Sequence, residues 1–596
     1  MANLEKEYSQ RVNRSQLIIA RLTRSLRTLS FLRLGFFILT LASPFLFYEI
    51  SLLLTIVVSV IAFSLFLFLV KWYQTLSLKR KFEQIKVEIN LQEQKALQHQ
   101  FSGFSDGSGF IDPHHMNSYD LDLFGKGSLF QFLNRTVTPK GNEQLAQVLQ
   151  HPMLEDTRIL KRQEMINELN IEIDWRQNFS AQGKMYGEDK TENDLFIQWS
   201  EQEFALRSLK IAPVLMVLLP VIAIASIIFW IVTGNSALFI FSLFLQAGWW
   251  MYESKQIKII YSQFGKRANI LQKYASLLKY IETFQWKSDE GKQMVQKLKH
   301  YGLPSVETQK LSEIISVFDN RNNFLIGFLL NLVFVWDIWN SYRLVNWHRR
   351  NKMNYRCWIE TIAMIDACNS LANYAYNHPE EVYPKFSDGE FHLKAEQMGH
   401  PLIHPHKRVC NNFELDGTHQ TIIITGANMS GKSTFLRTIG VNMVMGMSGA
   451  PVCAQRMVFK PVEVFSNMRT SDSLFDDESY FFAELKRLKA ILEEVDNGKE
   501  LLIILDEILK GTNSVDKLHG SQKLLRRLID QKTSAIIATH DLKLTEIEQE
   551  FPDRVRNMCF EINIENDEMQ FDYQLRKGVT TIMNASFLMK KMGIIK

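Results

Sequence analysis

The chain has 596 residues, room for about four domains that each bury a core of their own. Its formal net charge of +4 is close to balance for this length, so charge neither indicates nor excludes a nucleic-acid partner. The five cysteines lie far apart without a C-x-x-C pair. They indicate neither a disulfide framework nor a zinc site, and they fit a reducing compartment.

The N-terminal 70 residues divide into a basic part and an apolar part. Residues 1–33 are polar and basic, and the apolar part begins too late for an ordinary signal peptide, so we interpret them as a retained cytosolic segment. From residue 34 to 70 the only charged side chain is Glu49. The second half of this run is long enough to cross a bilayer, and the first reaches across if Arg33 snorkels. Residues 34–70 therefore predict a transmembrane hairpin.

A second charge-free stretch spans residues 211–252, with Gly234-Asn235-Ser236 as a turn in its middle. It predicts a second transmembrane hairpin, and the alternative is two unusually apolar buried helix pairs. Basic residues flank the outer ends of both stretches, so the positive-inside rule leaves the large domains in the cytoplasm. We thus expect a multi-pass protein of the inner or cytoplasmic membrane.

The remaining N-terminal part predicts mainly helices. Residues 71–123 are expected to form a helical linker with a flexible break at Gly103 to Gly109. Apolar residues at helical spacing predict one long amphipathic helix from Ser262 to Trp286. The shorter apolar run from Phe324 to Trp336 predicts a buried or interfacial helix. His114 and His115 have no third metal ligand at a useful spacing and are interpreted as loop residues.

A glycine-bounded loop follows the β-branched run that starts at Thr421. Residues 426–433 fit G-x-x-x-x-G-K-[ST], in which backbone N–H groups turn inward around phosphate oxygens at the start of a helix. Lys432 would neutralise the β and γ phosphates of ATP, and Ser433 would hold Mg²⁺. The candidate nucleotide-binding residues are Gly426, Ala427, Asn428, Met429, Ser430, Gly431, Lys432, Ser433 and Thr434.

Two later strands end in polar side chains. The run from Leu501 ends at Asp506, expected to hold the Mg²⁺ shell, and Glu507, expected to polarise the attacking water. The run from Ser534 ends at His540, which is placed to sense the γ-phosphate. Strands that alternate with helices predict an α/β domain with a mostly parallel sheet and the nucleotide at the carboxyl ends of its strands.

These motifs resemble the ATPase domain of the MutS family of DNA mismatch-repair proteins. The resemblance rests on residues 425–434, on Asp506-Glu-Ile508 with Gly511-Thr512 and Asp516, and on Ala538-Thr-His540. Residues 128–141 also resemble the start of the family's helical core. The resemblance implies a dimeric Mg-dependent ATP hydrolase that binds DNA. It also implies that Ser479, followed by Tyr480, Phe481 and Glu484, reaches the nucleotide of the partner subunit.

The resemblance and the apolar runs together predict the domain organisation. An all-α core occupies 124–210 and 253–395, the second hairpin interrupts it at 211–252, and the ATPase domain occupies 396–596. The chain before Phe124 leaves no room for the family's mismatch-reading domain.

The sequence also departs from the family pattern. Ala427 and Ser430 replace the usual Pro and Gly, Leu509-Lys510 replaces Gly-Arg, and Gly399 replaces Arg. Arg408 stands where an aromatic residue often stacks on adenine, and its guanidinium plane is expected to do the same.

Three functions remain open at this stage. The first is a membrane-anchored MutS-like ATPase that couples ATP hydrolysis to DNA binding. The second is an ABC-like transport or remodelling ATPase, against which stand the missing Leu-Ser-Gly-Gly-Gln signature and the uncharged hairpins. The third is a scaffold that binds ATP without hydrolysis, against which Asp506 and Glu507 argue.

Overall fold

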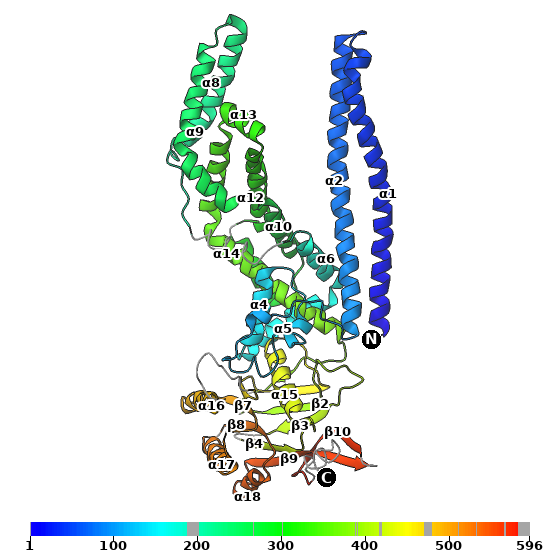
Figure 1. Ribbon diagram of the computed structural model, residues 1–596, viewed down its shortest axis with the longest axis vertical. Coiled ribbons are helices and arrows are strands. Elements are labelled where there is room, and N and C mark those ends of the chain that lie inside the picture. The colour runs from blue at the N-terminus through cyan, green and yellow to red at the C-terminus, as the bar shows by residue number, and fades with distance from the viewer. Residues whose placement is uncertain are drawn as a thin grey trace.

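The computed structural model describes residues 2–187, 202–265, 267–300, 302–387, 389, 391–416, 420–469, 480–510, 512–531, 533–565 and 568–581. The molecule is elongated: two helical arms stand at one end, an α/β region lies at the other, and a helical core joins them (Figure 1).

Arm 1 is a hairpin of two 46-residue helices, α1 (Ala2–Phe47) and α2 (Leu52–Leu97). Ser51 caps α2 by accepting a hydrogen bond from the Leu54 N–H, and the hydroxyls of Ser43 and Ser59 lie 2.6 Å apart between the helices. The apolar residues 34–70 form only the tip. Both helices continue through residues 33 and 70 into polar stems, because nothing at those positions interrupts helical hydrogen bonding.

Arm 2 consists of α8 (Ala212–Thr233) and α9 (Ala237–Phe264). Gly234 closes α8 with a φ of 74°, a left-handed conformation that suits glycine. The Asn235 side chain accepts a hydrogen bond from the Ala237 N–H at 2.9 Å and starts α9. The turn lies where the sequence predicts it.

Three helices in the described ranges are long and apolar enough to cross a membrane: Asn3–Phe47, Leu52–Leu97 and Ala212–Thr233. The sequence predicts four such spans, and α9 is not among the three. Its apolar run is diluted by Gln246 and Glu253, both fully buried. The Glu253 carboxylate accepts hydrogen bonds from the N–H groups of Arg207 and Ser208, so it holds the chain that leads into α8.

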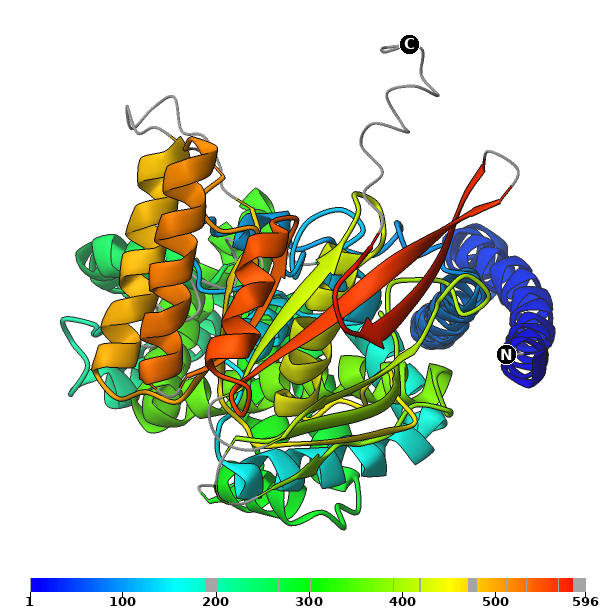
Figure 2. The ribbon, with the colours of Figure 1, turned by 90° about the horizontal axis from the view of Figure 1, so that it is seen from below.

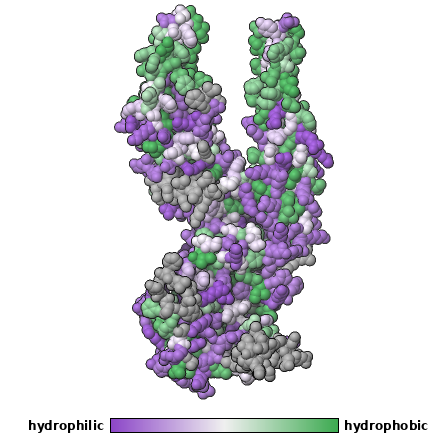
Figure 3. Space-filling model, viewed as in Figure 1, coloured by the Kyte–Doolittle hydropathy of each residue, from purple (hydrophilic) through white to green (hydrophobic). Residues whose placement is uncertain are grey.

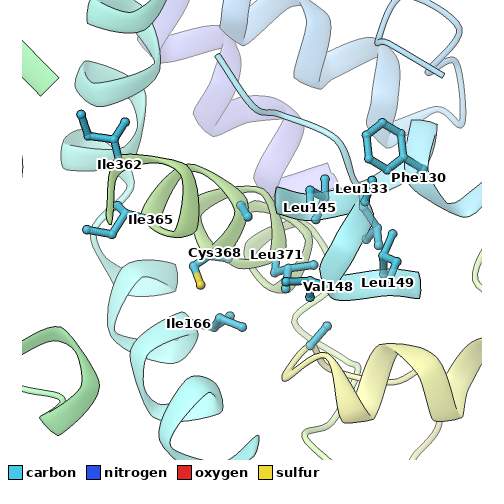
Figure 4. Packing of buried hydrophobic residues seen from close by; sticks show 14 of the residues in the cluster. Phe130, Leu133, Leu145, Val148, Leu149, Ile166, Ile362, Ile365, Cys368 and Leu371 are labelled. Atoms are coloured by element: carbon cyan, nitrogen blue, oxygen red, sulfur yellow. The ribbon is translucent and has the colours of Figure 1, made fainter. Parts of the chain in front are cut away.

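The core is all-helical and is built around the 42-residue helix α14 (Trp336–Asn377). Its other helices are α3 (Leu129–Leu133), α4 (Pro139–Gln150), α5 (Asp156–Ile171), α6 (Ile173–Lys184), α10 (Ala268–Thr283), α11 (Asp289–Lys299), α12 (Pro304–Phe318) and α13 (Phe324–Phe334), with short 3₁₀ turns η1 (Ser108–Phe110) and η2 (Asp319–Asn322). Figure 4 shows Leu145 and Leu149 of α4 and Ile166 of α5 packed against Cys368 and Leu371 of α14.

The prediction of one helix from Ser262 to Trp286 is wrong. Helix α9 ends at Phe264 and α10 begins at Ala268. Gly265 closes α9, and a Cβ at this position would lie 2.9 Å from the Tyr261 carbonyl oxygen and 2.6 Å from the Tyr261 ring. The apolar residues keep their helical spacing across the break, so the sequence pattern does not show that one helix ends and another begins.

The α/β region contains two sheets. The larger has the order β10-β9-β4-β8-β7-β6, and its pairs are parallel except β10 with β9. Its strands are β4 (Thr421–Gly426), β6 (Glu463–Asn467), β7 (Leu501–Asp506), β8 (Ser534–Thr539), β9 (Val555–Glu565) and β10 (Glu568–Lys577). The smaller sheet has the order β1-β5-β2-β3, from β1 (Lys385–Phe386), β2 (Leu393–Met398), β3 (Asn411–Leu415) and β5 (Arg456–Phe459).

The larger sheet is buried on both faces. Ile422 and Ile424 pack with α15 (Lys432–Met447) in one hydrophobic cluster, whereas Ile423 packs in another with α16 (Tyr480–Asp496) and α17 (Ser514–Asp530). Figure 2 shows α16, α17 and α18 (Ile547–Glu550), which follows η3 (Leu542–Glu546), together on one side. Burial on both faces explains why these strands read as continuous apolar runs in the sequence.

Candidate nucleotide-binding site

The glycine-bounded loop connects the end of β4 to the start of α15. Gly426 has a φ of 154° and Gly431 a φ of 105°, and both lie in the region that favours glycine. A Cβ at Gly426 would lie 2.8 Å from the Phe560 carbonyl oxygen. The loop therefore needs glycine at its first fixed position, and it ends at the N-terminus of a 16-residue helix, where an anion is favoured.

The parallel register brings three polar strand ends beside this loop. Thr425 pairs with Thr539, and Asp506 pairs with Ala538, so β4, β7 and β8 end at one level. Glu507 follows β7 with a φ of 58°, and its N–H donates to the Ala538 carbonyl oxygen at 2.9 Å. A non-glycine residue in this conformation is strained, as is common in functional sites.

The candidate catalytic side chains of β7, β8 and α15 lie in contact. Lys432 Nζ donates to the carbonyl oxygens of Gly426 at 2.7 Å and Ala427 at 2.9 Å, and lies 3.5 Å from His540 Nε2. His540 Nε2 is 3.6 Å from Glu507 Oε1. One acid, one imidazole and one amine thus share a single contact network beneath the loop.

The electrostatics of Lys432 favour an anionic ligand. The residue is 6% exposed, and burial lowers its pKa to about 8 against the opposing effect of Asp506 and Glu507. Burial and the charge of Lys432 also lower the pKa of His540. A phosphate beside Lys432 would stabilise the ammonium form, so the buried amine fits a phosphate-bearing ligand.

A pocket of about 580 Å³ opens in front of these groups. Its loop side is lined by all predicted residues from Asn428 to Thr434, with Asp506, Glu507 and His540 opposite. Gly426 and Ala427 are not in the lining, and they serve instead as the carbonyl partners of Lys432. The lining also includes residues that were not among the predicted site residues: Met398, His400, Ile403, Lys407, Val409, Asn411, Phe435, Thr438, Lys510, Phe560 and Tyr573.

The expectation for Arg408 is corrected by the structure. Its guanidinium points to Glu381, with Nη1 3.6 Å from Oε1, and the residue is not in the pocket lining. Gly399, which replaces the arginine usual in the family, makes this position of Arg408 possible. A Cβ at residue 399 would lie 2.6 Å from Arg408 Cδ, so only glycine leaves room for the arginine side chain. Aromatic side chains at the pocket come instead from other residues, among them Tyr573 and Phe560.

Ser479, the residue expected to act across a dimer, lies outside the described residues. Glu484, five residues later on α16, is described: its carboxylate accepts hydrogen bonds from the N–H groups of Leu509 at 2.7 Å and Lys510 at 3.1 Å. Leu509 has a φ of 60° where the family usually has glycine, and Glu484 holds that turn in place.

Two regions of the chain match domain models of known proteins. Residues 115–193 match MutS domain III, and residues 422–590 match MutS domain V. The first covers the start of the helical core, and the second covers nearly all of the larger sheet and the loop side of the pocket.

Curated relatives match over a similar part. The DNA mismatch repair protein MutS of Thermotoga maritima is 32% identical over 225 residues, which are 37% of this chain and 27% of that protein. MutS protein homolog 4 of Homo sapiens is 32% identical over 235 residues, 38% of this chain and 24% of that protein. The chain thus matches about a quarter of the length of these relatives. In these two regions the chain is therefore similar to proteins of the MutS family.

Proposed function

We propose that this protein is a membrane-anchored, MutS-like ATPase that binds and hydrolyses ATP with Mg²⁺. The observation that carries the proposal is the convergence of Lys432, Asp506, Glu507 and His540 on one pocket beside a glycine-bounded loop. Each of these groups has a part to play in phosphoryl transfer to water.

The proposed roles follow from position. Lys432 neutralises phosphate charge, and the backbone N–H groups of the loop bind phosphate oxygens. Ser433 and Asp506 hold Mg²⁺, which shields the phosphates when bound. Glu507 accepts a proton from, and orients, the attacking water, and His540 contacts the γ-phosphate. Tyr573 and Val409, which also line the pocket, are proposed to contact the base.

Turnover of the detergent-solubilised protein tests this assignment. Lys432→Ala removes the cation and should abolish ATP binding. Glu507→Gln keeps the shape of the side chain but not its basicity, so it should bind ATP and lose turnover by about a hundredfold or more. Normal hydrolysis by either variant would refute the site, and binding without hydrolysis by the wild type would favour the scaffold alternative.

We propose that the active form is a homodimer in which Ser479 acts on the partner's nucleotide. The test is a mixture of Ser479→Ala and Lys432→Ala proteins, each inactive alone. Mixed dimers contain one site with an intact loop and an intact partner serine, so turnover should return to a fraction of the wild-type rate. A mixture without activity would remove the support for action across the dimer.

The arms are proposed to anchor the protein in a membrane. Large apolar side chains cover their tips and face outward, among them Phe45, Ile50 and Leu53 of arm 1 and Ile231, Val232 and Phe244 of arm 2. Figure 3 shows hydrophobic surface on the upper part of both arms and polar surface below. Exposed apolar surface of this extent is costly in water, and lipid covers it without cost.

DNA binding is proposed because the relative from Thermotoga maritima is named as a DNA mismatch repair protein. ATP turnover should change when homoduplex, mismatched or branched DNA is added, and binding should weaken as salt rises. Turnover that ignores all three DNAs but depends on the lipid would favour the ABC-like alternative. Neither a response to DNA nor a response to lipid changes the assignment of the ATPase site.

A further inference from the structure

A polar cavity lies where arm 1 meets the core, and it shares no lining residue with the nucleotide pocket. Its inner chamber of about 180 Å³ is enclosed by α2, the loop that follows it, α6 and α14. An outer chamber of about 580 Å³ opens beside it. Ser105, Thr136, Asn142 and Lys184 line both chambers. In Figure 1, α6 lies between α2 and α14 at this level.

The inner chamber contains more positive charge than negative. Its one carboxylate, Glu93, is held by Arg135 through two hydrogen bonds of 2.5 and 3.3 Å and also accepts from Asn377. The other two cations in the lining are Arg176 and Lys184. Within the described ranges, neither has a carboxylate within 4 Å. Three cations and one carboxylate leave the lining with a net charge of about +2, although Glu93 attracts both cations and Glu88, outside the lining, attracts Lys184.

Arg176 is 2% exposed, which makes its charge costly. Its guanidinium donates to Asn373 Oδ1 at 2.8 Å and lies over the Tyr376 ring, while its Nε has no hydrogen-bond partner. Opposite it, Asn369 is also 2% exposed and its Oδ1 has no partner. Both side chains line the inner chamber, and each has one buried polar atom without a hydrogen-bond partner.

The outer chamber is closer to electrical balance. Glu143 pairs with Lys140 at 2.6 Å, and Asp106 accepts a hydrogen bond from the Ser108 N–H. Lys273 donates to the Val137 carbonyl oxygen at 2.9 Å. The excess positive charge is therefore confined to the inner chamber, which also has the amides and hydroxyls of Asn142, Gln177 and Ser180.

We propose that this cavity binds a small phosphorylated, hydroxyl-bearing molecule, with its phosphoryl group beside Arg176 and Lys184 in the inner chamber. A phosphate monoester carries a charge of about −1.5 to −2 at neutral pH, which matches the two unpaired cations. A hydroxyl of the ligand donates to Asn369 Oδ1, and the body of the ligand extends into the outer chamber. Since the walls come from both arm 1 and the core, the ligand joins the two.

Calorimetry on the full-length protein in detergent tests the proposal. The Lys432→Ala background removes the nucleotide loop as a second phosphate site, so the result does not depend on the proposed ATPase function. Ribose 5-phosphate and inorganic phosphate are the probes, and ribose is the uncharged comparison. Both phosphates should bind and ribose should not. The proposal would be overturned if neither ribose 5-phosphate nor inorganic phosphate binds.

Two variants locate the binding. Asn369→Asp places a carboxylate of the same shape in the inner chamber and should weaken phosphate binding by about tenfold or more. Lys184→Gln removes a cation at the exposed mouth, where folding is not at risk, and should weaken it several-fold. Lys95→Gln, the same change at an exposed position on α2 outside the cavity, is the matched control and should have no effect. Unchanged affinity in the Lys184→Gln protein would place the phosphate elsewhere.

Discussion

Tyr573 illustrates how one residue is aimed at the nucleotide pocket. It has a φ of 53° within β10, where the pairing with β9 shifts register between Phe571 and Leu575. Asn411 fixes this bulge from β3: its Nδ2 donates to the Tyr573 carbonyl oxygen at 3.0 Å, and its Oδ1 accepts from the Leu575 N–H at 2.8 Å. Bulges of this kind re-aim side chains. The Tyr573 ring thereby comes to the loop, with Cδ1 3.1 Å from the position of a Cβ on Gly431.

We predict that Tyr573→Ala weakens ATP binding with little change in the rate at saturation. Stacking of a base on an aromatic ring is worth about 1–3 kcal/mol, so KM should rise by roughly five- to a hundredfold. Tyr573→Phe keeps the ring and should retain most of the affinity. A steady-state titration of turnover against ATP distinguishes the two, and an unchanged KM in the alanine variant would exclude a stacking role.

The motif residues of the pocket could be predicted from sequence, whereas their partners could not. Fixed spacing places Lys432 after the loop, and apolar runs place Asp506 and His540 at strand ends, all of which line the pocket. The positions of the Arg408 and Tyr573 side chains depend on contacts with residues that are distant in the sequence. The arginine is turned away through the space above Gly399, and the tyrosine is aimed by a bulge whose register is set by Asn411.

At the level of elements, the start of α4 is tied to the middle of α14. The Asp366 carboxylate of α14 accepts hydrogen bonds from the N–H groups of Val137 and Thr138 and from the Thr138 hydroxyl. Burial raises the pKa of Asp366 to about 6 against the effect of these donors. Gly141, in the first turn of α4, lets the carboxylate approach: a Cβ there would lie 2.2 Å from Asp366 Oδ2.

Gly141→Ala is therefore expected to destabilise the core. The added methyl group must displace either the carboxylate or α4, and overpacking of this kind costs about 1–3 kcal/mol. Thermal unfolding in detergent measures the loss. The control is Gly109→Ala, because a Cβ at Gly109 meets nothing within 4 Å and its melting temperature should stay near the wild-type value. Equal stability of the two variants would contradict the packing argument.

Element boundaries were harder to predict than element types. The apolar runs correctly indicated helices at 34–70 and 211–252, yet the described helices of arm 1 extend 46 residues each through polar stems. Where a polar sequence follows an apolar run, its pattern does not show whether the same helix continues or a separate linker begins. Conversely, helix α9 ends at Phe264 although the apolar residues keep their helical spacing into α10, so the pattern does not reveal the break.

For the whole molecule, the two arms point the same way, and the α/β region, whose residues line most of the nucleotide pocket, lies at the opposite end (Figure 1). Each arm carries an arginine stacked on a tyrosine below its apolar tip. Arg33 lies 4.8 Å from the Tyr73 ring centroid in arm 1, and Arg207 lies 5.3 Å from that of Tyr252 in arm 2. Tyrosine is enriched at the boundary between lipid and water, so we propose that the two pairs lie at a membrane surface shared by both arms.

This arrangement predicts which residues face each side of the membrane. In a Cys357→Ser, Cys410→Ser background the remaining native cysteines are buried. Ser51→Cys and Asn235→Cys, at the tips, should react with an impermeant maleimide only from the face opposite the nucleotide pocket. Lys79→Cys and Lys258→Cys, at the exposed stems, should react only from the pocket side.

Arm 2 is the decisive case because α8 but not α9 is apolar enough to span by itself. Burial of Gln246 and Glu253 against other parts of the protein removes the cost of placing these polar groups in lipid, so the α8–α9 pair is expected to cross as one hairpin. Labelling of Asn235→Cys from the pocket side in intact vesicles would show that arm 2 does not cross. Arm 1 would then be the sole anchor among the described helices, and its Ser51→Cys pattern would be unchanged.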